Sequence, residues 1–358
     1  MSKKLFIRGT LLLTFTGLFS RLIGFFYRIF LSHTIGAHGL GIFQLVLPLQ
    51  LLILSVCASG IQTAISRLTA SEITLGHSRR AGDYFLTGTV FSVSFSLIFS
   101  WLLYTYSDFW ACHILKEPQT VSLIRLLSFS IPLSTFHSCV NSYYFGRKKA
   151  AFPAGVQLIE QIFRVGGCYL LYLILPVIAV GGNLIGEIAS SFLSLFTVSM
   201  HFQKTSDTSS RTEKPFLLLK DLFQISVPLT LNKVLLTILG SIEVILIPAR
   251  LQMSGLSSRD ALSIYGIFTG MALPLILFPA TVTNSAAVML LPSITELQTL
   301  GYQKRIRYVI SQIFRYCLLL GGVCMILFLF LGEFLGNFLF HSQTAGIYIQ
   351  TMAYICPF

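Results

Sequence analysis

A succession of apolar stretches, each about 20 residues long and followed by a short polar linker, constrains this chain more than any other feature. A helix of this length crosses the hydrocarbon core of a bilayer. The chain is 54% hydrophobic and only 11% charged, with a mean hydropathy of +0.78, which excludes a water-soluble domain of this size. The sequence therefore predicts an all-α integral membrane protein. The expected spans lie near residues 5–31, 40–66, 84–106, 122–145, 153–175, 180–202, 222–250, 263–291 and 308–332, with a tenth beginning near Ala345.

Basic residues gather in alternate linkers. The net charge of +12 comes from 25 Lys and Arg against 13 Asp and Glu. By the positive-inside rule, the linkers rich in Lys and Arg face the cytoplasm, and so does the N-terminus. This topology accounts for the basic charge, so nucleic acid is not expected as a partner. The basic clusters are Lys3, Lys4 and Arg8; Arg67, Arg79 and Arg80; Arg147, Lys148 and Lys149; Lys204, Arg211, Lys214 and Lys220; and Lys304, Arg305 and Arg307.

An internal repeat and a polar linker divide the spans. The tripeptide GIF at 41–43 leads to LPL at 47–49, and GIF at 266–268 leads to LPL at 273–275. The match is short, so chance similarity is the alternative, but it pairs the second span with the eighth and indicates a parallel repeat. We expect two six-helix bundles around a central cavity: an N-terminal lobe at 1–202, a cytoplasmic linker at 203–220 and a C-terminal lobe at 221–358. The second bundle is expected to be incomplete, truncated in its fourth helix.

The first span carries arginines inside an apolar helix. Thr10, Thr14, Gly17, Arg21, Gly24 and Arg28 recur at helical spacing and share one stripe. A charge near the bilayer centre costs roughly 2.5–3.5 kcal/mol, so such arginines normally face a bundle interior or a wet cavity. We interpret the stripe as one wall of a cationic cavity. The alternative is that Arg28 snorkels to an interface and Arg21 pairs with a carboxylate of another helix.

Other intramembrane polar residues form smaller groups. Glu160 and Arg164 are four residues apart in the fifth span, which suits either an ion-coupling site or a self-satisfied structural pair. Lys233 and Glu243 lie on different faces of the seventh span. Lys233 follows Pro228, so we expect local unwinding and a substrate or gating role there.

The eighth span is interrupted by Pro274, Pro279 and Pro292 and offers Asn284 as a polar group, which is typical of a broken transporter helix, although a structural kink would also explain the prolines. For Glu187, packing among small residues is the favoured interpretation. For His137, a plain polar contact is favoured over a proton relay.

Catalytic and cofactor-binding patterns are absent from the sequence. It contains no HExxH, GxSxG, Walker or Rossmann motif, and its seven cysteines form no CxxC pair, so neither an enzyme nor a metal or other cofactor site is expected. Transport would then depend on ion gradients, membrane potential or the gradient of the substrate. The positive walls expected from the first, seventh and eighth spans suit a phosphate or pyrophosphate head group, because arginine presents a planar fork to phosphate oxygens.

Several segments resemble the stage V sporulation protein B family, which belongs to the polysaccharide-exporter branch of the multidrug, oligosaccharidyl-lipid and polysaccharide flippase superfamily. They lie at residues 8–44, 59–68, 157–165, 239–252 and 265–296. The resemblance implies two six-helix lobes, usually followed by two further helices, in a bacterial plasma membrane. It also implies a role in flipping or exporting lipid-linked precursors of the cell wall or spore cortex.

A more distant similarity concerns the flippases of the peptidoglycan lipid precursor, whose first helix carries a Ser-Arg-x-x-Gly-Phe motif. Here the motif is SRLIGF at 20–25, which implies a phosphate contact for Arg21. The next basic residue after the motif is Arg28, which lies one position later in this chain than the corresponding basic residue in those flippases. They also place an arginine in the eighth helix, where this chain has only Asn284.

The favoured hypothesis is a flippase that works by alternating access as a monomer, with Arg21, Arg28, Lys233 and Asn284 binding an anionic lipid-linked saccharide or polyprenyl pyrophosphate. Glu160, Arg164 and Glu243 would serve ion coupling or structure. A cation-coupled multidrug exporter of the same superfamily is the alternative, but it needs acidic groups in its cavity. A scaffold for cell-wall synthesis enzymes is a third hypothesis, which no sequence feature supports.

Overall fold

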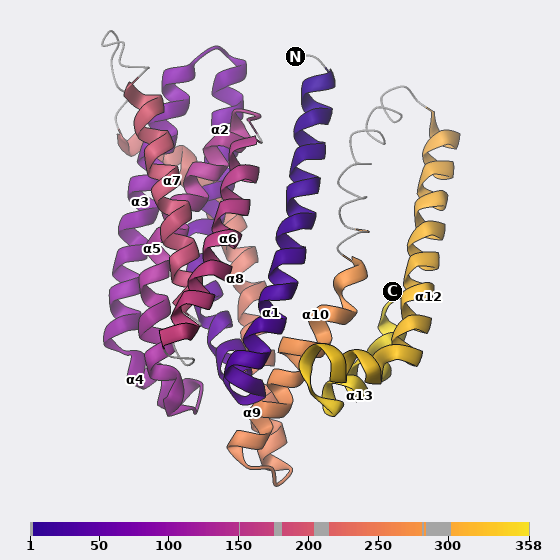
Figure 1. Cartoon of the computed structure of the whole chain (residues 1–358). Helices are drawn as coiled ribbons and strands as arrows, with labels where there is room; N and C mark the ends of the chain where they lie inside the picture. Colours follow the sequence, from indigo (N-terminus) through magenta and orange to yellow (C-terminus); the bar gives the residue numbers. More distant parts are fainter. Residues whose placement is uncertain are drawn as a thin grey trace. The chain divides into compact units, whose positions relative to one another are not determined.

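The computed structural model describes residues 3–149, 151–174, 181–203, 215–280, 283 and 302–357 (Figure 1). Within these ranges every regular element is a helix. The hydrocarbon core offers no water to backbone N–H and C=O groups, so a spanning segment must satisfy them inside its own helix. The all-α fold predicted from the apolar stretches is therefore confirmed.

Each predicted span contains a described helix. The order begins with α1 (Lys3–Leu54), a π-helical turn (Ser55–Ser59), α2 (Gly60–Thr74), α3 (Ser78–Thr105), α4 (Ser107–Phe109), α5 (Val121–Gly146), α6 (Ala151–Ile174) and α7 (Gly182–Gln203). It continues with α8 (Pro215–Met253), α9 (Ser258–Gly266), a second π-helical turn (Ile267–Ala272), α10 (Leu273–Ile276), α12 (Gln303–Phe340) and α13 (Gln343–Met352).

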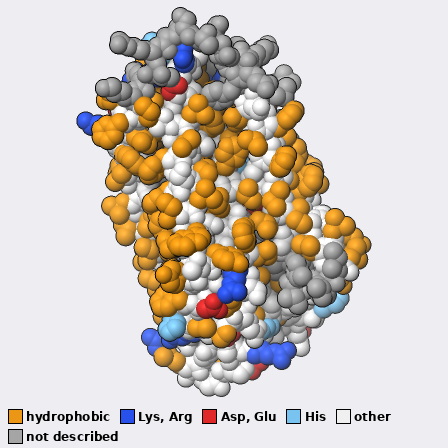
Figure 2. Space-filling model, turned by 90° about the vertical axis from the view of Figure 1, so that its left-hand side faces the viewer, with side chains coloured by type: hydrophobic (Ala, Val, Ile, Leu, Met, Phe, Trp, Pro, Cys, Tyr) orange, Lys and Arg blue, Asp and Glu red, His pale blue; other side chains and the backbone are white. Residues whose placement is uncertain are grey.

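Five of the described helical segments are long and apolar enough to cross a membrane. On the face shown in Figure 2, apolar side chains cover the middle of the molecule and charged side chains lie toward its ends. A multi-pass membrane protein has this distribution because only apolar side chains are at low free energy against lipid tails. The segments are Phe15–Thr74, Ser78–Thr105, Pro118–Gly146, Pro215–Met253 and Gln303–Phe340.

The junction between the first two predicted spans is a bend rather than a loop. Residues 32–39 separate the first two predicted spans, 5–31 and 40–66. In the structure the helix of each span runs into this gap, and the two helices within α1 meet across a kink at Gly36 (φ 67°, ψ 179°). That pair of angles is nearly restricted to glycine, which has no Cβ. One glycine thus joins the two helices without a longer loop, inside the gap that the sequence leaves between the first two spans.

Two predicted interruptions lie in proline-containing segments. Helix α8 continues through Pro228, so the local unwinding predicted near Lys233 is not found. A membrane helix can tolerate an internal proline where neighbouring groups satisfy the freed carbonyl. In the eighth span, α9, the π-helical turn and α10 follow one another as far as Ile276, and helical geometry continues past Pro274. Pro292 lies outside the described residues, so a broken transporter helix remains a prediction.

Contacts divide the chain into two compact units, which are described separately. Unit 1 comprises Met1–Gly41 and Ser257–Phe358, and unit 2 comprises Ile42–Leu256. The lobes expected from the sequence, 1–202 and 221–358, divide the chain at other positions and remain a prediction.

Unit 2 has a buried core shared by α2, α3, α5 and α8. Tyr84 and Phe85 of α3 are 2% and 1% exposed, and they pack with Ile65 of α2, Tyr143 of α5 and Leu222 of α8. At the edge of this core the Tyr84 hydroxyl donates a hydrogen bond of 2.6 Å to Asp221 Oδ2. The core thus connects α8, which follows the polar linker, to helices from the first half of the chain.

In unit 1 the two glycines of the internal repeat meet. A Cβ at Gly41 would overlap the carbonyl of Leu262, and a Cβ at Gly266 would overlap the carbonyl of Ala37. Leu262 lies four positions before Gly266, and Ala37 lies four positions before Gly41, so each glycine faces a carbonyl one helical turn before the other glycine. Small residues allow membrane helices this close an approach. A reciprocal contact is what a two-fold relation between the two copies produces, so this crossing supports the repeat.

Candidate functional site

The first part of α1 presents the arginine stripe, which we define as Gly17, Arg21, Gly24 and Arg28. Arg21 is exposed and Arg28 is half-buried. A Cβ added at Gly17 or Gly24 would have no described atom within 4 Å. The two arginines therefore border open space, and the two glycines leave room between them. The side chains of Thr10 and Thr14 lie outside the described part of the chain.

No described residue forms an ion pair or a hydrogen bond with the guanidinium of Arg21 or Arg28. On the neighbouring face, Ser20 and Tyr27 are buried, at 4% and 6% exposed, and the Ser20 hydroxyl has no described hydrogen-bond partner. The carboxylate that the alternative interpretation requires for Arg21 is not found within the described ranges. The stripe has the donors and the free space that an anion needs.

The other predicted substrate residues lie elsewhere. Lys233 and Glu243 are exposed on α8, and the Lys233 carbonyl accepts a hydrogen bond of 2.8 Å from Thr237 Oγ1. They belong to unit 2, whereas Arg21 belongs to unit 1, so a cavity that Lys233 and Arg21 share remains a prediction. Asn284 lies outside the described residues.

A buried polar cluster occupies the interface of α5, α6 and α7 in unit 2. The Arg164 guanidinium donates to Glu160 Oε1, and Glu160 Oε2 lies 3.8 Å from His137 Nε2. His137 Nδ1 is 3.0 Å from Ser194 Oγ, and Asn141 Nδ2 is 2.8 Å from His137 Nε2. With Asn141 as the donor, the imidazole is the neutral Nδ1–H tautomer. His137 and Asn141 are four residues apart on one face of α5, but no sequence signal links that face to Glu160 of α6.

Glu187 of α7 joins this cluster. A Cβ at Gly186 would lie 2.9 Å from the Glu160 carbonyl and 3.0 Å from Arg164 Cβ, so α7 approaches α6 closely at this point. The Glu187 carboxylate thereby comes within electrostatic range of both Glu160 and Arg164. Arg164 forms its ion pair with Glu160, and Glu187 lies near both, so the cluster holds two carboxylates and one guanidinium; a neutral His137 adds no positive charge. Glu187 is therefore more than a residue packed among glycines, as the sequence analysis interpreted it.

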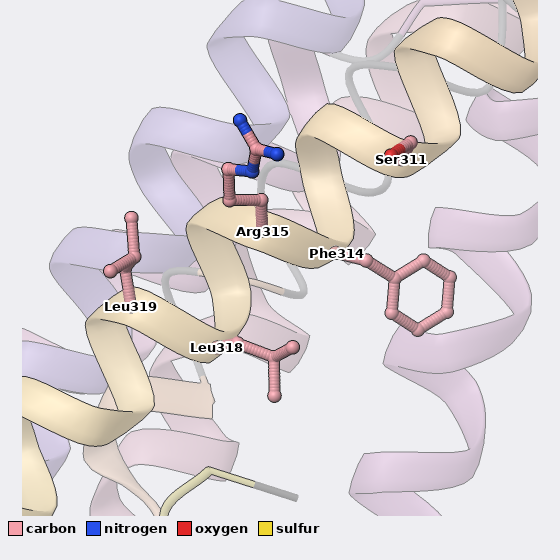
Figure 3. Close-up of a pocket in the computed structure, with 5 residues that line it drawn as sticks. All are labelled: Ser311, Phe314, Arg315, Leu318 and Leu319. Atoms are coloured by element: carbon pink, nitrogen blue, oxygen red, sulfur yellow. The ribbon is translucent and has the colours of Figure 1, made fainter.

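A further basic residue, Arg315, lies on α12 and was not singled out from the sequence. It is exposed and borders a pocket of about 440 Å³ (Figure 3). Its sequence signal is an arginine just before a long uncharged stretch.

A model of the family described as "Polysaccharide biosynthesis protein" matches residues 6–298 of the chain. The chain belongs to this polysaccharide biosynthesis protein family. Stage V sporulation protein B of Bacillus subtilis (strain 168) is 25% identical over 365 residues, an alignment that covers 99% of this chain and 70% of that protein. This confirms the family resemblance found in the sequence.

Two other relatives come from the same organism. Sporulation protein YkvU is 24% identical, with 97% of this chain and 78% of that protein covered. Lipid II flippase MurJ is 24% identical, with 87% of this chain and 61% of that protein covered.

Solved structures agree on the fold of this family member. The Vibrio cholerae MATE transporter VcmN has a TM-score of 0.66 at 16% identity, covering 98% of this chain and 80% of that one. A MOP superfamily transporter from Pyrococcus furiosus has a TM-score of 0.58 at 15% identity, covering 100% and 82%. At these identities the likeness establishes a shared transporter fold and no shared substrate.

Proposed function

We propose that the protein flips or exports an anionic lipid-linked saccharide precursor for the cell wall or spore cortex, by alternating access. The observation that carries this proposal is Arg21, an exposed arginine inside an apolar helix with no partner among the described residues. It stands in the SRLIGF motif of a chain whose relatives include a protein named lipid II flippase.

The arginine stripe would bind the phosphate or pyrophosphate of the head group. A guanidinium can donate two parallel hydrogen bonds to phosphate oxygens, and this pairing gains strength where water is scarce. Gly17 and Gly24 leave space for the head group beside Arg21, while the lipid tail stays among the lipid chains. Lys233 and Asn284 would complete the site from the second lobe. The head group of the substrate thus supplies the anion with which the arginines pair.

The polar cluster around Glu160 would couple transport to an ion. Glu160 and Glu187 carry two negative charges against the single positive charge of Arg164, and a buried unmatched charge is unfavourable. One proton bound by a carboxylate or by His137 would balance the cluster. We therefore assign Glu160 and Arg164 to ion coupling, with Glu243 as a second acidic candidate on α8.

The proposed setting is the bacterial plasma membrane, with the N-terminus in the cytoplasm and the protein working as a monomer. The distribution of Lys and Arg among the linkers supports this orientation.

The test is a flipping assay in vesicles with a fluorescent polyprenyl-pyrophosphate saccharide. Arg21→Gln should reduce the initial rate at least about 100-fold, and Arg21→Lys should retain part of it, because a lysine keeps the charge but not the fork. Arg259→Gln, which removes an exposed arginine of α9, is the matched control and should leave the rate unchanged. Full activity of Arg21→Gln would exclude the proposed role of the stripe.

The alternative is a cation-coupled multidrug exporter, because MATE transporters share the fold. Arginines facing open space on α1 disfavour a cationic drug. Accumulation of a cationic dye in the same vesicles, abolished by Glu160→Gln but not by Arg21→Gln, would favour the exporter over the flippase.

A further inference from the structure

Arg315 lies where the polar beginning of α12 meets its apolar part. From Cys317 to Gly332 the helix contains no charged residue, and Glu333 is the next one. The span expected from the sequence, 308–332, would place Arg315 inside the hydrocarbon core. The uncharged stretch itself, 316–332, rises about 26 Å as a helix, close to the thickness of a core of about 30 Å, and it begins directly after Arg315. Arg315 therefore stands at the edge of that core, at the depth where lipid phosphates lie.

The pocket beside Arg315 combines polar and apolar walls. Its described lining consists of Ser311, Phe314, Arg315, Leu318 and Leu319, all on α12, around a volume of about 440 Å³. Figure 3 shows Leu319 on the side of α12 to which Arg315 extends, whereas Phe314 points away from the arginine; these two apolar side chains are 58% and 66% exposed. A guanidinium and a hydroxyl next to exposed hydrocarbon are suited to a molecule with an anionic head and an apolar tail.

An exposed polar stripe leads along α12 to this pocket. Lys304, Tyr308, Ser311 and Arg315 follow one another at steps of four, three and four residues, so they share one face. All four side chains are exposed, and no described residue forms an ion pair with Arg315. A guanidinium at the edge of the hydrocarbon core is stabilised by an anion, and the anion abundant at that depth is phosphate.

We propose that this face of α12 is a binding site for a lipid phosphate. Arg315 and Ser311 hold the phosphate, and Phe314, Leu318 and Leu319 contact the first part of the lipid chain. The site is separate from the arginine stripe of α1, and lipid binding to it does not require that the protein flips lipids.

Native mass spectrometry of the purified protein in detergent tests this site. The probes are a polyprenyl monophosphate, phosphatidylglycerol, diacylglycerol as the lipid without phosphate, and inorganic phosphate. We expect Arg315→Gln to weaken binding of the polyprenyl phosphate at least about tenfold, Arg315→Lys to weaken it less, and Ser311→Ala to weaken it two- to threefold. Arg259→Gln, which removes an exposed arginine of α9, controls for the net charge and should retain tight binding of this lipid.

Each outcome decides the proposal. Equal binding of polyprenyl phosphate and phosphatidylglycerol, both lost in Arg315→Gln, supports a general lipid-phosphate site, and a preference for the polyprenyl lipid supports a substrate-selective one. Unchanged binding in Arg315→Gln, equal loss in Arg259→Gln, equal binding of diacylglycerol, or displacement by millimolar inorganic phosphate would overturn it. A melting temperature of Arg315→Gln equal to that of the unmodified protein shows that the fold is intact. If Arg315→Gln melts at a lower temperature, binding of the polyprenyl phosphate to Arg315→Lys and to Arg315→Gln is compared. Tighter binding by Arg315→Lys supports the proposal, and equal binding by the two variants overturns it.

Discussion

At the scale of single residues, Arg164 is the residue of the polar cluster whose loss should cost the most stability, because it is the cation nearest to both Glu160 and Glu187. Its partner Glu160 has a side chain only 14% exposed, and its own side chain is 22% exposed. Breaking a buried ion pair is costly chiefly because a charge remains without compensation. Removing Arg164 and removing Glu160 should therefore lower the free energy of unfolding by different amounts, although both substitutions break the same ion pair.

Removal of the guanidinium should destabilise the protein far more than removal of the Glu160 charge. Arg164→Gln leaves Glu160 and Glu187 without a matching cation, and we expect a loss of about 3–5 kcal/mol. Glu160→Gln leaves one carboxylate for one guanidinium, so the loss should be below about 2 kcal/mol. Thermal unfolding of the purified variants at neutral pH measures both. Equal losses would show that Glu187 does not share Arg164.

The double variant Glu160→Gln with Arg164→Gln provides the control. Glu187 alone stays charged in it, so it should be more stable than Arg164→Gln by itself. If the two single losses simply add, the charges of Glu160 and Arg164 are not coupled.

At the scale of helices, glycines set the geometry of unit 1. Gly41 and Gly266 allow the two copies of the repeat to cross with backbone against backbone, and Gly36 allows α1 to bend. The repeated GIF tripeptide and the gap between the first two spans are visible in the sequence, but the single residue at which the chain bends is not. Hydropathy locates apolar stretches, whereas a bend at one glycine depends on two backbone angles that leave no trace in composition.

Alanine at the crossing should separate the two helices. In Gly41→Ala or Gly266→Ala the new methyl group meets a backbone carbonyl that no side-chain rotation can move, and we expect a loss of about 1–3 kcal/mol for each. Gly322→Ala on α12 is the matched control, because a Cβ there has no described atom within 4 Å. It should be neutral or stabilising by up to about 1 kcal/mol. Thermal unfolding in detergent distinguishes them, and crossing variants as stable as the control would refute the close contact.

A side chain at the bend of α1 should be strained for a different reason. Gly36→Ala meets no neighbour within 4 Å, but alanine rarely adopts a φ of 67° with a ψ of 179°. We expect a loss on the order of 1–3 kcal/mol from the backbone alone. The loss should be the same in Gly36→Ser, because a backbone penalty applies to any side chain. A stable Gly36→Ala variant would mean that the bend does not depend on glycine.

At the scale of the whole molecule, the sequence predicted the membrane class, the all-α fold and the family. These follow from hydropathy and from motifs such as SRLIGF, which depend on the chain alone. It did not foretell that Glu187 and His137 share a cluster with Glu160, because that proximity arises from packing between helices. Nor did it foretell the pocket at Arg315, which requires a three-dimensional surface.

The orientation of the molecule in the membrane can be tested with a cysteine that the chain already contains. Cys112 is exposed in the segment between α3 and α5, which the distribution of basic residues assigns to the outer side of the membrane. In intact cells, a membrane-impermeant maleimide should modify the unaltered protein but not Cys112→Ser, which identifies the labelled site. In the Cys112→Ser background, Ser209→Cys in the linker at 203–220 should react only after the membrane is permeabilised, because that linker carries basic residues. The opposite orientation would follow if Ser209→Cys reacted in intact cells and Cys112 of the unaltered protein reacted only after permeabilisation. The exposed polar stripe of α12 that contains Arg315 would then face the outer leaflet. The same experiment therefore decides from which side of the membrane a lipid phosphate can reach Arg315.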